Sequence, residues 1–431
     1  MQKSSTFQLI LLLAFGFAAA AAVLMFAGVI PSPFKKESVG SAGTVVVWGT
    51  VSKNIILDSF NSLNKGNEDK FVLTYVQKNA ETFGEELTEA LASGYGPDVI
   101  LAPHEIILSQ TNRIYPYSIN YFPKRNYYDV FIDGARLFET DEAYFALPVA
   151  VDPLVLYYNK EIYKTNNLTN PPATWEEFVR NQSKLTSLSD SGNLNQSAVA
   201  LGTFSNITNA KDIFSLLLLQ AGNPIVYFDG QGVRQTLAEN LGYALMPAQA
   251  ALEFFVQFAD PAKTTYSWHR SWPSSSDSFL AGKLINYFGF ASEYNYLKDK
   301  NPHLNFDVAE VPQQNISKRQ TFGRFYGLAI MKSSSKIQAA LSAVYAISVS
   351  KEAEKIASAI PAVSVKREIL AKGAVDPYQQ IFYEASIVAK AWLDFRPTQS
   401  AKIFSDLVDN YSSGRLRAVE AIKEAAGLLN K

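Results

Sequence analysis

The pattern of apolar and polar residues along the chain alternates between short β-branched runs and longer stretches with helical spacing. The runs TVVVWGT (44–50), FVLTYV (71–76) and PDVILA (97–102) are typical of β-strands. Apolar positions three and four residues apart predict helices over 55–63 and 81–94 between these strands. Strands that alternate with helices indicate a largely parallel α/β sheet.

The same alternation continues through the rest of the chain. PPATWEEF (171–178) predicts a helix start, because Thr174 can cap it and Glu177 follows three residues later. Trp175 in this motif is interpreted as packing. Further elements follow in this order: helices over 210–220 and 248–258, a helix end with a turn at Gly282 and a strand within 278–290, a strand over 324–331 and a helix within 333–348.

The N-terminal region has a different pattern. Residues 9–30 carry no charged or strongly polar side chain, and as a helix they would span about 33 Å, which matches the hydrocarbon core of a bilayer. We expect a tail over 1–8, an uncleaved transmembrane anchor over 9–30 and a linker over 31–43 rich in Pro, Ser, Gly and Lys. The alternative is a cleaved secretory signal. The remaining chain is then expected on the extracytoplasmic side.

Composition narrows the function classes. The net charge is −1, so the chain lacks the electrostatic footprint of a nucleic-acid-binding protein. It has no cysteine, which excludes disulfides, thiolate catalysis, cysteine-ligated metals and a lipidated cysteine. With 22 tyrosines and 28 phenylalanines against three histidines, the chain suits recognition by stacking better than histidine-centred chemistry. We expect no metal and no cofactor.

Several catalytic motifs are missing. There is no glycine-rich phosphate loop of the Walker type, so the chain itself is not expected to hydrolyse ATP. PHEIIL resembles the start of a zinc-protease helix, but Leu108 stands where a second histidine is required. No G-x-S-x-G nucleophile motif is present. Carboxylates are numerous, so a glycosidase-type pair stays open.

The stretch LPVAVDPLVLYYNKEIY (147–163) contains a lone acid in an otherwise strand-like apolar run. Asp152 would be costly to bury without a partner. Either it caps a turn before Pro153, or a group from elsewhere, including a ligand, satisfies it. Tyr158 is interpreted as scaffold, with Asn159 and Lys160 shaping the turn that follows.

The longer segment YFALPVAVDPLVLYYNKEIYKTNNLTNPPATWEEF (144–178) resembles the extracellular solute-binding proteins of ABC importers, in the maltose-binding-protein-like family. Further matches lie in the family's order: VVVWG, PDVILAPHE, SFLAGKLINYFG, GRFYGLAIMKSSSKIQAALSAVYAIS and AIPAVSVKREI. Together they cover nearly everything from Thr44 to the C-terminus.

The resemblance implies an α/β fold with two hinged lobes, the periplasmic-binding-protein-like type II fold, behind the N-terminal transmembrane helix. Each lobe is expected to be discontinuous in sequence. Lobe one is predicted over 44–152 and about 323–375, and lobe two over about 153–322 and 376–431.

The implied function is a membrane-tethered receptor, not an enzyme, that binds a sugar or oligosaccharide between the lobes and delivers it to ABC permease subunits. The chain is expected to be a monomer and a single-pass protein of the cell membrane. Two alternatives stay open: a glycan-processing hydrolase that uses two of the carboxylates, and a sensor or surface-binding module that has kept the fold without transport.

The resemblance also implies a ligand site. Asp152 falls where the family places a sugar-binding acid, and a carboxylate can accept two sugar hydroxyls at once. Ala102 and Ile106 replace a stacking tryptophan and an arginine of the family pattern, so maltose itself is not expected. The predicted ligand-binding residues are Trp48, His104, Glu105, Asp152, Trp268, Trp272, Phe290, Glu293, Arg324, Phe325 and Tyr326.

Structural alternatives accompany these assignments. Trp48 could pack on the sheet instead of facing a ligand. His104 could be a loop histidine whose hydrogen bonds are satisfied by the protein. Trp268 and Trp272 could pack as lids over the core.

Overall fold

The computed structural model of the chain describes residues 43–228, 233–360 and 362–430. The predicted tail and anchor, and all of the predicted linker except Gly43, lie outside these ranges. Inside them, every helix is too short or too polar to cross a bilayer.

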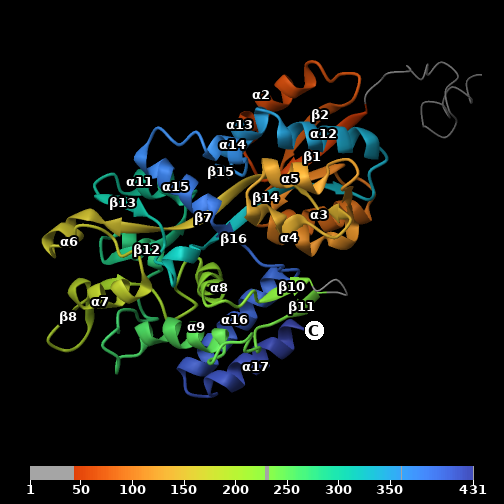
Figure 1. The fold of residues 1–431 in the computed structure, drawn as a ribbon. Helices are drawn as coiled ribbons and strands as arrows, with labels where there is room; N and C mark the ends of the chain where they lie inside the picture. Colours follow the sequence, from red (N-terminus) through yellow and green to blue (C-terminus); the bar gives the residue numbers. More distant parts are fainter. Residues whose placement is uncertain (1–42, 229–232, 361, 431) are drawn as a thin grey trace, which may run out of the picture.

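A 12-stranded sheet forms the centre of the molecule, with the strand order β2-β1-β3-β14-β7-β12-β9-β8 (Figure 1). β1 (Thr44–Gly49) pairs in parallel with β2 (Val72–Gln77) and β3 (Val99–Pro103), as the sequence predicts. α2 (Lys53–Asn64) and α3 (Phe83–Ala92) connect these strands. The parallel strands and their helices confirm the predicted α/β class.

Two long strands join the two ends of this sheet. β7 (Leu147–Asn159) and β14 (Thr321–Met331) are antiparallel neighbours, and Asp152 lies opposite Arg324 in their register. The predicted boundaries at 152/153 and 322/323 fall in these strands at adjacent register positions. Where one lobe ends and the other begins stays a prediction.

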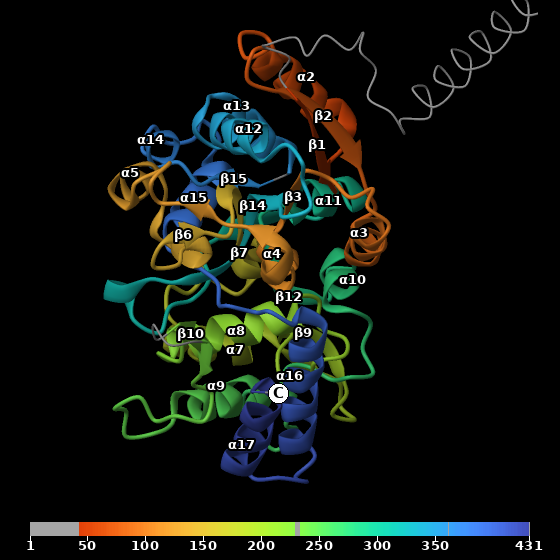
Figure 2. The same ribbon diagram turned by 90° about the vertical axis from the view of Figure 1, so that its right-hand side faces the viewer.

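The other end of the sheet is formed by β12 (Leu284–Phe290), β9 (Leu194–Val199) and β13 (Phe306–Ala309), with β12 and β13 antiparallel to β7. The helices around it are α7 (Trp175–Leu185), α8 (Ala210–Gln220), α9 (Pro247–Val256), α16 (Pro397–Ser412) and α17 (Ala418–Leu429). Figures 1 and 2 both show α9, α16 and α17 gathered at the end of the molecule opposite α2 and β2.

The other described elements are short or cover the sheet. They are α4 (His104–Ser109), η1 (Thr111–Arg113), β4 (Ile114–Tyr115), β5 (Tyr117–Ser118), α5 (Lys124–Val130), η2 (Asp133–Phe138), β6 (Ala143–Tyr144), α6 (Lys160–Thr165), β8 (Ser187–Leu188), β10 (Val226–Phe228), β11 (Val233–Gln235), η3 (Gln257–Ala259), α10 (Ser275–Leu280), α11 (Glu293–Lys300), η4 (Ile316–Lys318), α12 (Ile337–Val349), α13 (Glu352–Ala359), β15 (Val363–Ser364), α14 (Arg367–Leu370), α15 (Pro377–Ile387) and β16 (Ala389–Lys390).

Local sequence signals explain several element ends. The Thr174 hydroxyl accepts the backbone N–H of Glu177, as the predicted cap requires. The Asn159 side chain accepts two N–H groups at the start of α6, which ends the long strand β7. Gly282 has φ +71°, so the turn before β12 uses a conformation that favours glycine.

Both faces of β7 are covered, since every residue of the strand except Tyr158 is buried. α12, α13 and α15 all pack against it. A strand covered on both faces has the near-continuous apolar sequence seen here. Asp152 is therefore buried in the core of the sheet, with 1% of its surface exposed.

Gly134 gives a test of the packing beside these strands. An added Cβ at Gly134 would lie 2.3 Å from the backbone oxygen of Ala389 and 2.4 Å from the Phe325 ring. We expect Gly134→Ala to lower the free energy of unfolding by about 1–3 kcal/mol, because the backbone must shift to make room. Urea unfolding measures the loss. The matched control is Gly84→Ala, where a Cβ meets open space and stability should not fall.

Candidate functional site

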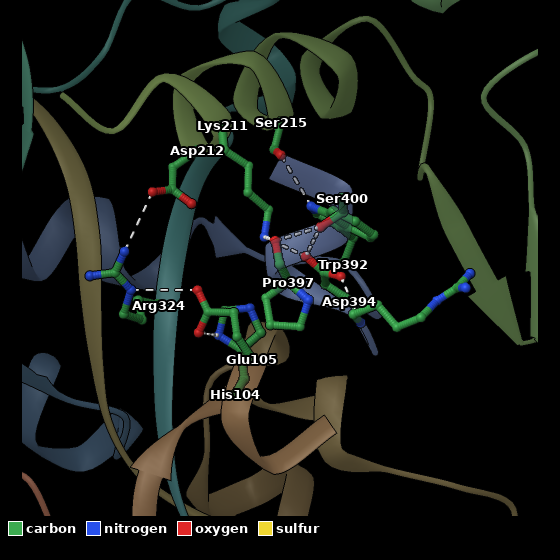
Figure 3. A network of polar contacts seen from close by, with 11 residues as sticks. His104, Glu105, Lys211, Asp212, Ser215, Arg324, Trp392, Asp394, Pro397 and Ser400 are labelled. Carbon is green, nitrogen blue, oxygen red and sulfur yellow. Dashed lines mark hydrogen bonds and ion pairs between the residues drawn. The ribbon is translucent and has the colours of Figure 1, made fainter. Parts of the chain in front are cut away.

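Charged side chains from α4, α8, β14 and the segment before α16 lie close together (Figure 3), and Asp152 of β7 lies opposite Arg324 in the strand register. α4 supplies Glu105, α8 supplies Lys211 and Asp212, and the paired strands β7 and β14 supply Asp152 and Arg324. The segment before α16 supplies Asp394. We call these six residues the central cluster: Glu105, Asp152, Lys211, Asp212, Arg324 and Asp394.

Arg324 lies in the middle of the central cluster. Its Nε is 3.5 Å from Oε1 of Glu105, and its Nη2 is 3.4 Å from Oδ2 of Asp212. Its guanidinium also lies 4.3 Å from the centre of the Phe290 ring. Burial lowers the pKa of Arg324, but the carboxylates of Glu105 and Asp212 outweigh it and raise the pKa above its ordinary value. Arg324 thus links α4 to α8.

Lys211 connects α8 to the chain before α16. Its Nζ pairs with Oδ2 of Asp394, and the Ser400 hydroxyl donates to the same oxygen at 2.6 Å. Trp392 adds a second link, because its indole N–H donates to the hydroxyl of Ser215 on α8 at 3.1 Å. Figure 3 shows Lys211 and Ser215 pointing from α8 toward this segment.

His104 lies next to Glu105 and contacts the backbone of β14. Its Nδ1 accepts the backbone N–H of Phe325 at 3.2 Å, so the ring proton is on Nε2 and the imidazole is neutral. Burial also lowers the pKa of His104. A neutral Nδ1 cannot donate to Oε2 of Glu105, although the two atoms are 3.2 Å apart. Glu105 Oε2 is therefore a buried acceptor that receives no hydrogen bond from the residues the structure describes.

The remaining carboxyl groups differ in how well the fold satisfies them. Oδ1 of Asp152 accepts the backbone N–H of Ser292 at 2.9 Å, and burial raises the pKa of Asp152 to about 7. Burial likewise raises the pKa of Asp212 to about 6. Oε1 of Glu293 accepts from Asn209 at 2.7 Å and from the Phe290 N–H at 2.8 Å. Glu293 is thus held by Asn209 and the Phe290 backbone, and Asp152 by Ser292.

The predicted aromatic residues fall into different environments. Phe290 lies under the Arg324 guanidinium, and Tyr326 is partly buried beside it on β14. Phe325 is fully buried against His104, with ring centres 6.4 Å apart. Trp48 is 8% exposed, and the Nζ of Lys78 lies 3.8 Å from the centre of its ring.

Trp268 and Trp272 form a pair apart from the central cluster. Their rings meet edge to face at 5.4 Å, and the Trp268 N–H donates to Oδ1 of Asn206 at 3.1 Å. Trp268 has no exposed surface. In the described ranges neither ring has a polar or ring contact with a residue of the central cluster. Their role as ligand contacts stays a prediction.

Sequence reasoning missed Lys211, Asp212, Trp392 and Asp394. The available signal was weak: two charges at the start of a predicted helix, and a tryptophan near an aspartate in a loop. Trp392 also lines a cavity of about 560 Å³, together with Arg136, Tyr227 and Lys390. Over 43–228, 233–360 and 362–430, no group of three or more His, Asp or Glu is placed to hold a metal ion.

Comparison with known proteins adds a family and several related folds. The model of a family described as "Bacterial extracellular solute-binding protein" matches residues 56–407. A binding protein of Brucella abortus (strain 2308) is 22% identical over 184 residues, which are 42% of this chain and 40% of that protein. The aligned region thus spans less than half of this relative.

Solved structures match over almost the whole chain. A cyclo/maltodextrin-binding protein complexed with maltotetraose has a TM-score of 0.70 at 17% identity, covering 91% of this chain and 98% of that one. The cyclic alpha-maltosyl-1,6-maltose binding protein of Arthrobacter globiformis has a TM-score of 0.72 at 16% identity, covering 90% and 98%. Likeness at this level of identity establishes the α/β two-lobe fold.

Proposed function

This chain belongs to the bacterial extracellular solute-binding proteins, and we propose that its solute is a sugar or oligosaccharide held at the central cluster. The observation that carries the proposal is the meeting of Glu105, Asp152 and Arg324. These residues lie far apart in the sequence, yet Asp152 and Arg324 are opposite each other in register and Arg324 contacts Glu105.

The chemistry of the central cluster supports a ligand rich in hydroxyl groups. None of the described residues donates a hydrogen bond to Glu105 Oε2, and Ser292 donates one to Oδ1 of Asp152. The hydroxyl groups of such a ligand can donate hydrogen bonds to both carboxyl groups. We propose that sugar rings stack on Tyr326, which is partly buried, and on Phe290 once Arg324 has moved away from its ring. The two solved neighbours named above also bind oligosaccharides.

We further propose that the two halves joined by β7 and β14 open and close around the solute. The arrangement described here is then the closed one, with Arg324 in the space between α4 and α8.

The chain would hand its solute to ABC permease subunits and stay at the extracytoplasmic face of the membrane through residues 9–30. Trp268, Trp272 and Trp48 are proposed as residues that report closure by fluorescence.

We infer that the solute leaves unaltered. The matched family is described as binding proteins, and both solved neighbours are binding proteins. The alternative is a hydrolase using Asp152 and Glu105. Incubation with an oligosaccharide, followed by mass spectrometry, distinguishes the two: the sugar should be recovered intact, and shortened products would support the hydrolase.

A thermal and fluorescence titration against sugars, amino acids, peptides and polyamines tests the binding proposal. A bound solute should stabilise the chain by about 2.7 kcal/mol at a hundredfold excess over its Kd. Asp152→Asn and Glu105→Gln should weaken that stabilisation. The exposed change Glu176→Gln should not, since its side chain is 83% exposed. If no sugar shifts melting or fluorescence at millimolar concentration, the sugar proposal is wrong.

A further inference from the structure

We propose that the central cluster selects solutes that carry a positive charge, and that amine-bearing sugars are the class that fits it. In the arrangement described here, the chain's own Arg324 occupies the place that the ligand's cation would take. This inference rests on the proposed function, because it specifies the solute of the same site.

The first argument is the balance of charges. Four carboxyl groups and two cations make up the central cluster. His104 adds no charge, because its Nδ1 accepts a backbone N–H. Lys211 is paired with Asp394, which leaves Arg324 as the cation between Glu105 and Asp212. Asp152 adds negative charge as far as it is ionised, since burial raises its pKa to about 7. Carboxyl groups therefore outnumber cations around Arg324.

The second argument is an acceptor without a donor. Oε2 of Glu105 is buried and receives no hydrogen bond from any described residue. Leaving a buried charged acceptor unsatisfied is costly, and a ligand donor would remove that cost. An ammonium group carries three donors and a full charge, so it satisfies such an oxygen more strongly than a hydroxyl does.

The third argument comes from the aromatic faces. The Phe290 ring at the central cluster already carries a cation, because the Arg324 guanidinium lies 4.3 Å from the centre of the ring. An aromatic face of this kind attracts positive charge. A neutral sugar that displaced Arg324 from Phe290 would lose this attraction, whereas an amine would replace it.

The fourth argument is that Arg324 is held loosely enough to be displaced. Its contacts to Glu105 and Asp212 are 3.5 Å and 3.4 Å, well beyond the roughly 2.7–2.9 Å of a good charge-assisted hydrogen bond. An anionic solute has no such route into the site, because it would face the carboxyl groups. Like charges across an interface cost several kcal/mol, which is how unwanted partners are rejected.

The test compares two sugars with one backbone. The full chain, in detergent, is titrated with tetra-glucosamine and with its fully N-acetylated form near neutral pH, with maltotetraose as a second neutral sugar. Isothermal titration calorimetry gives each Kd at low and at high salt. We expect the free amine to bind at least about tenfold more tightly than the acetylated form, with a gap that narrows as salt screens the charges.

Variants of the chain test whether Glu105 causes the preference for the amine-bearing sugar. Glu105→Gln keeps the size of the side chain but removes its charge, so the preference for the amine should fall to about twofold or less. The matched control Glu176→Gln, an exposed residue on α7, should retain the full preference. The comparison of the two sugars on the unaltered chain does not depend on either variant folding.

Three outcomes overturn the inference. Acetylated or other neutral sugars that bind as tightly as the free amine would leave the proposed sugar receptor standing and refute charge selection. Absence of binding by any of the three sugars would refute both the inference and the sugar receptor. An amine preference that survives Glu105→Gln unchanged would remove the central cluster as its cause.

Discussion

Replacement of Arg324 by methionine is expected to lower the free energy of unfolding by about 1–3 kcal/mol, the cost of leaving mostly buried acceptors without their donor; the Arg324 side chain is itself 29% exposed. The variant leaves the carboxyl groups of Glu105 and Asp212 buried without their cation. It also removes the contact of the guanidinium with Phe290. Urea unfolding at neutral pH measures the loss, through the shift in midpoint.

The control for this variant is Arg319→Met. Arg319 pairs with Glu310 at 3.0 Å, a shorter distance than either contact of Arg324, but its side chain is 38% exposed against 29% for Arg324, and Glu310 is more exposed than Glu105 or Asp212. Exposed pairs contribute about 0–1 kcal/mol, so this variant should be nearly as stable as the parent. Equal losses in the two variants would show that the location of Arg324 between α4 and α8 does not matter. Adding Glu105→Gln and Asp212→Asn to Arg324→Met should recover part of the lost stability.

Asp152→Asn is expected to stabilise the chain, and increasingly so as the pH rises. Burial raises the pKa of Asp152 from 3.8 to about 7 in the folded state. The folded chain therefore binds a proton that the unfolded chain has released, so this group's contribution to stability falls as the pH rises from about 4 to about 7. Above that range the full penalty is present, about 4 kcal/mol for a shift of this size.

The measurement is the difference in unfolding free energy between variant and parent across this pH range. The gain from Asp152→Asn should be near zero at the acid end and reach its maximum above about pH 7. Asp299→Asn, at an exposed position on α11, is the control and should give a flat difference. If the difference in unfolding free energy for Asp152→Asn is also independent of pH, Asp152 is not buried as an ionisable acid. Solute affinity should fall in the same variant, which would separate the role in binding from the role in stability.

The sequence predicted the architecture because the pattern that specifies it is local. The strand over 44–50, the helix over 210–220 and the cap at Thr174 depend on residues within a turn of one another, and all three are present. The apolar run around Asp152 likewise predicted a buried strand, because a strand covered on both faces has few polar residues.

The site was predictable where it follows a strand end or where the family resemblance places it. His104 and Glu105 follow the end of β3, where ligands bind in open α/β sheets. Asp152 and Arg324 lie within β7 and β14, and the resemblance assigned them. Asp212 and Asp394 reach the same place through the packing of α8 and the chain before α16. Asp212 is 112 residues from its partner Arg324, and Lys211 is 183 residues from Asp394. No local pattern encodes contacts at such separations.

The position of the first strand has a mechanical consequence. β1 begins at Thr44 and lies between β2 and β3, with parallel hydrogen-bond ladders on both sides. A pull along the strand from its N-terminal end would load all rungs of both ladders at once in shear, instead of peeling them one by one. A force applied ahead of Thr44 is therefore resisted by the hydrogen bonds of both ladders together.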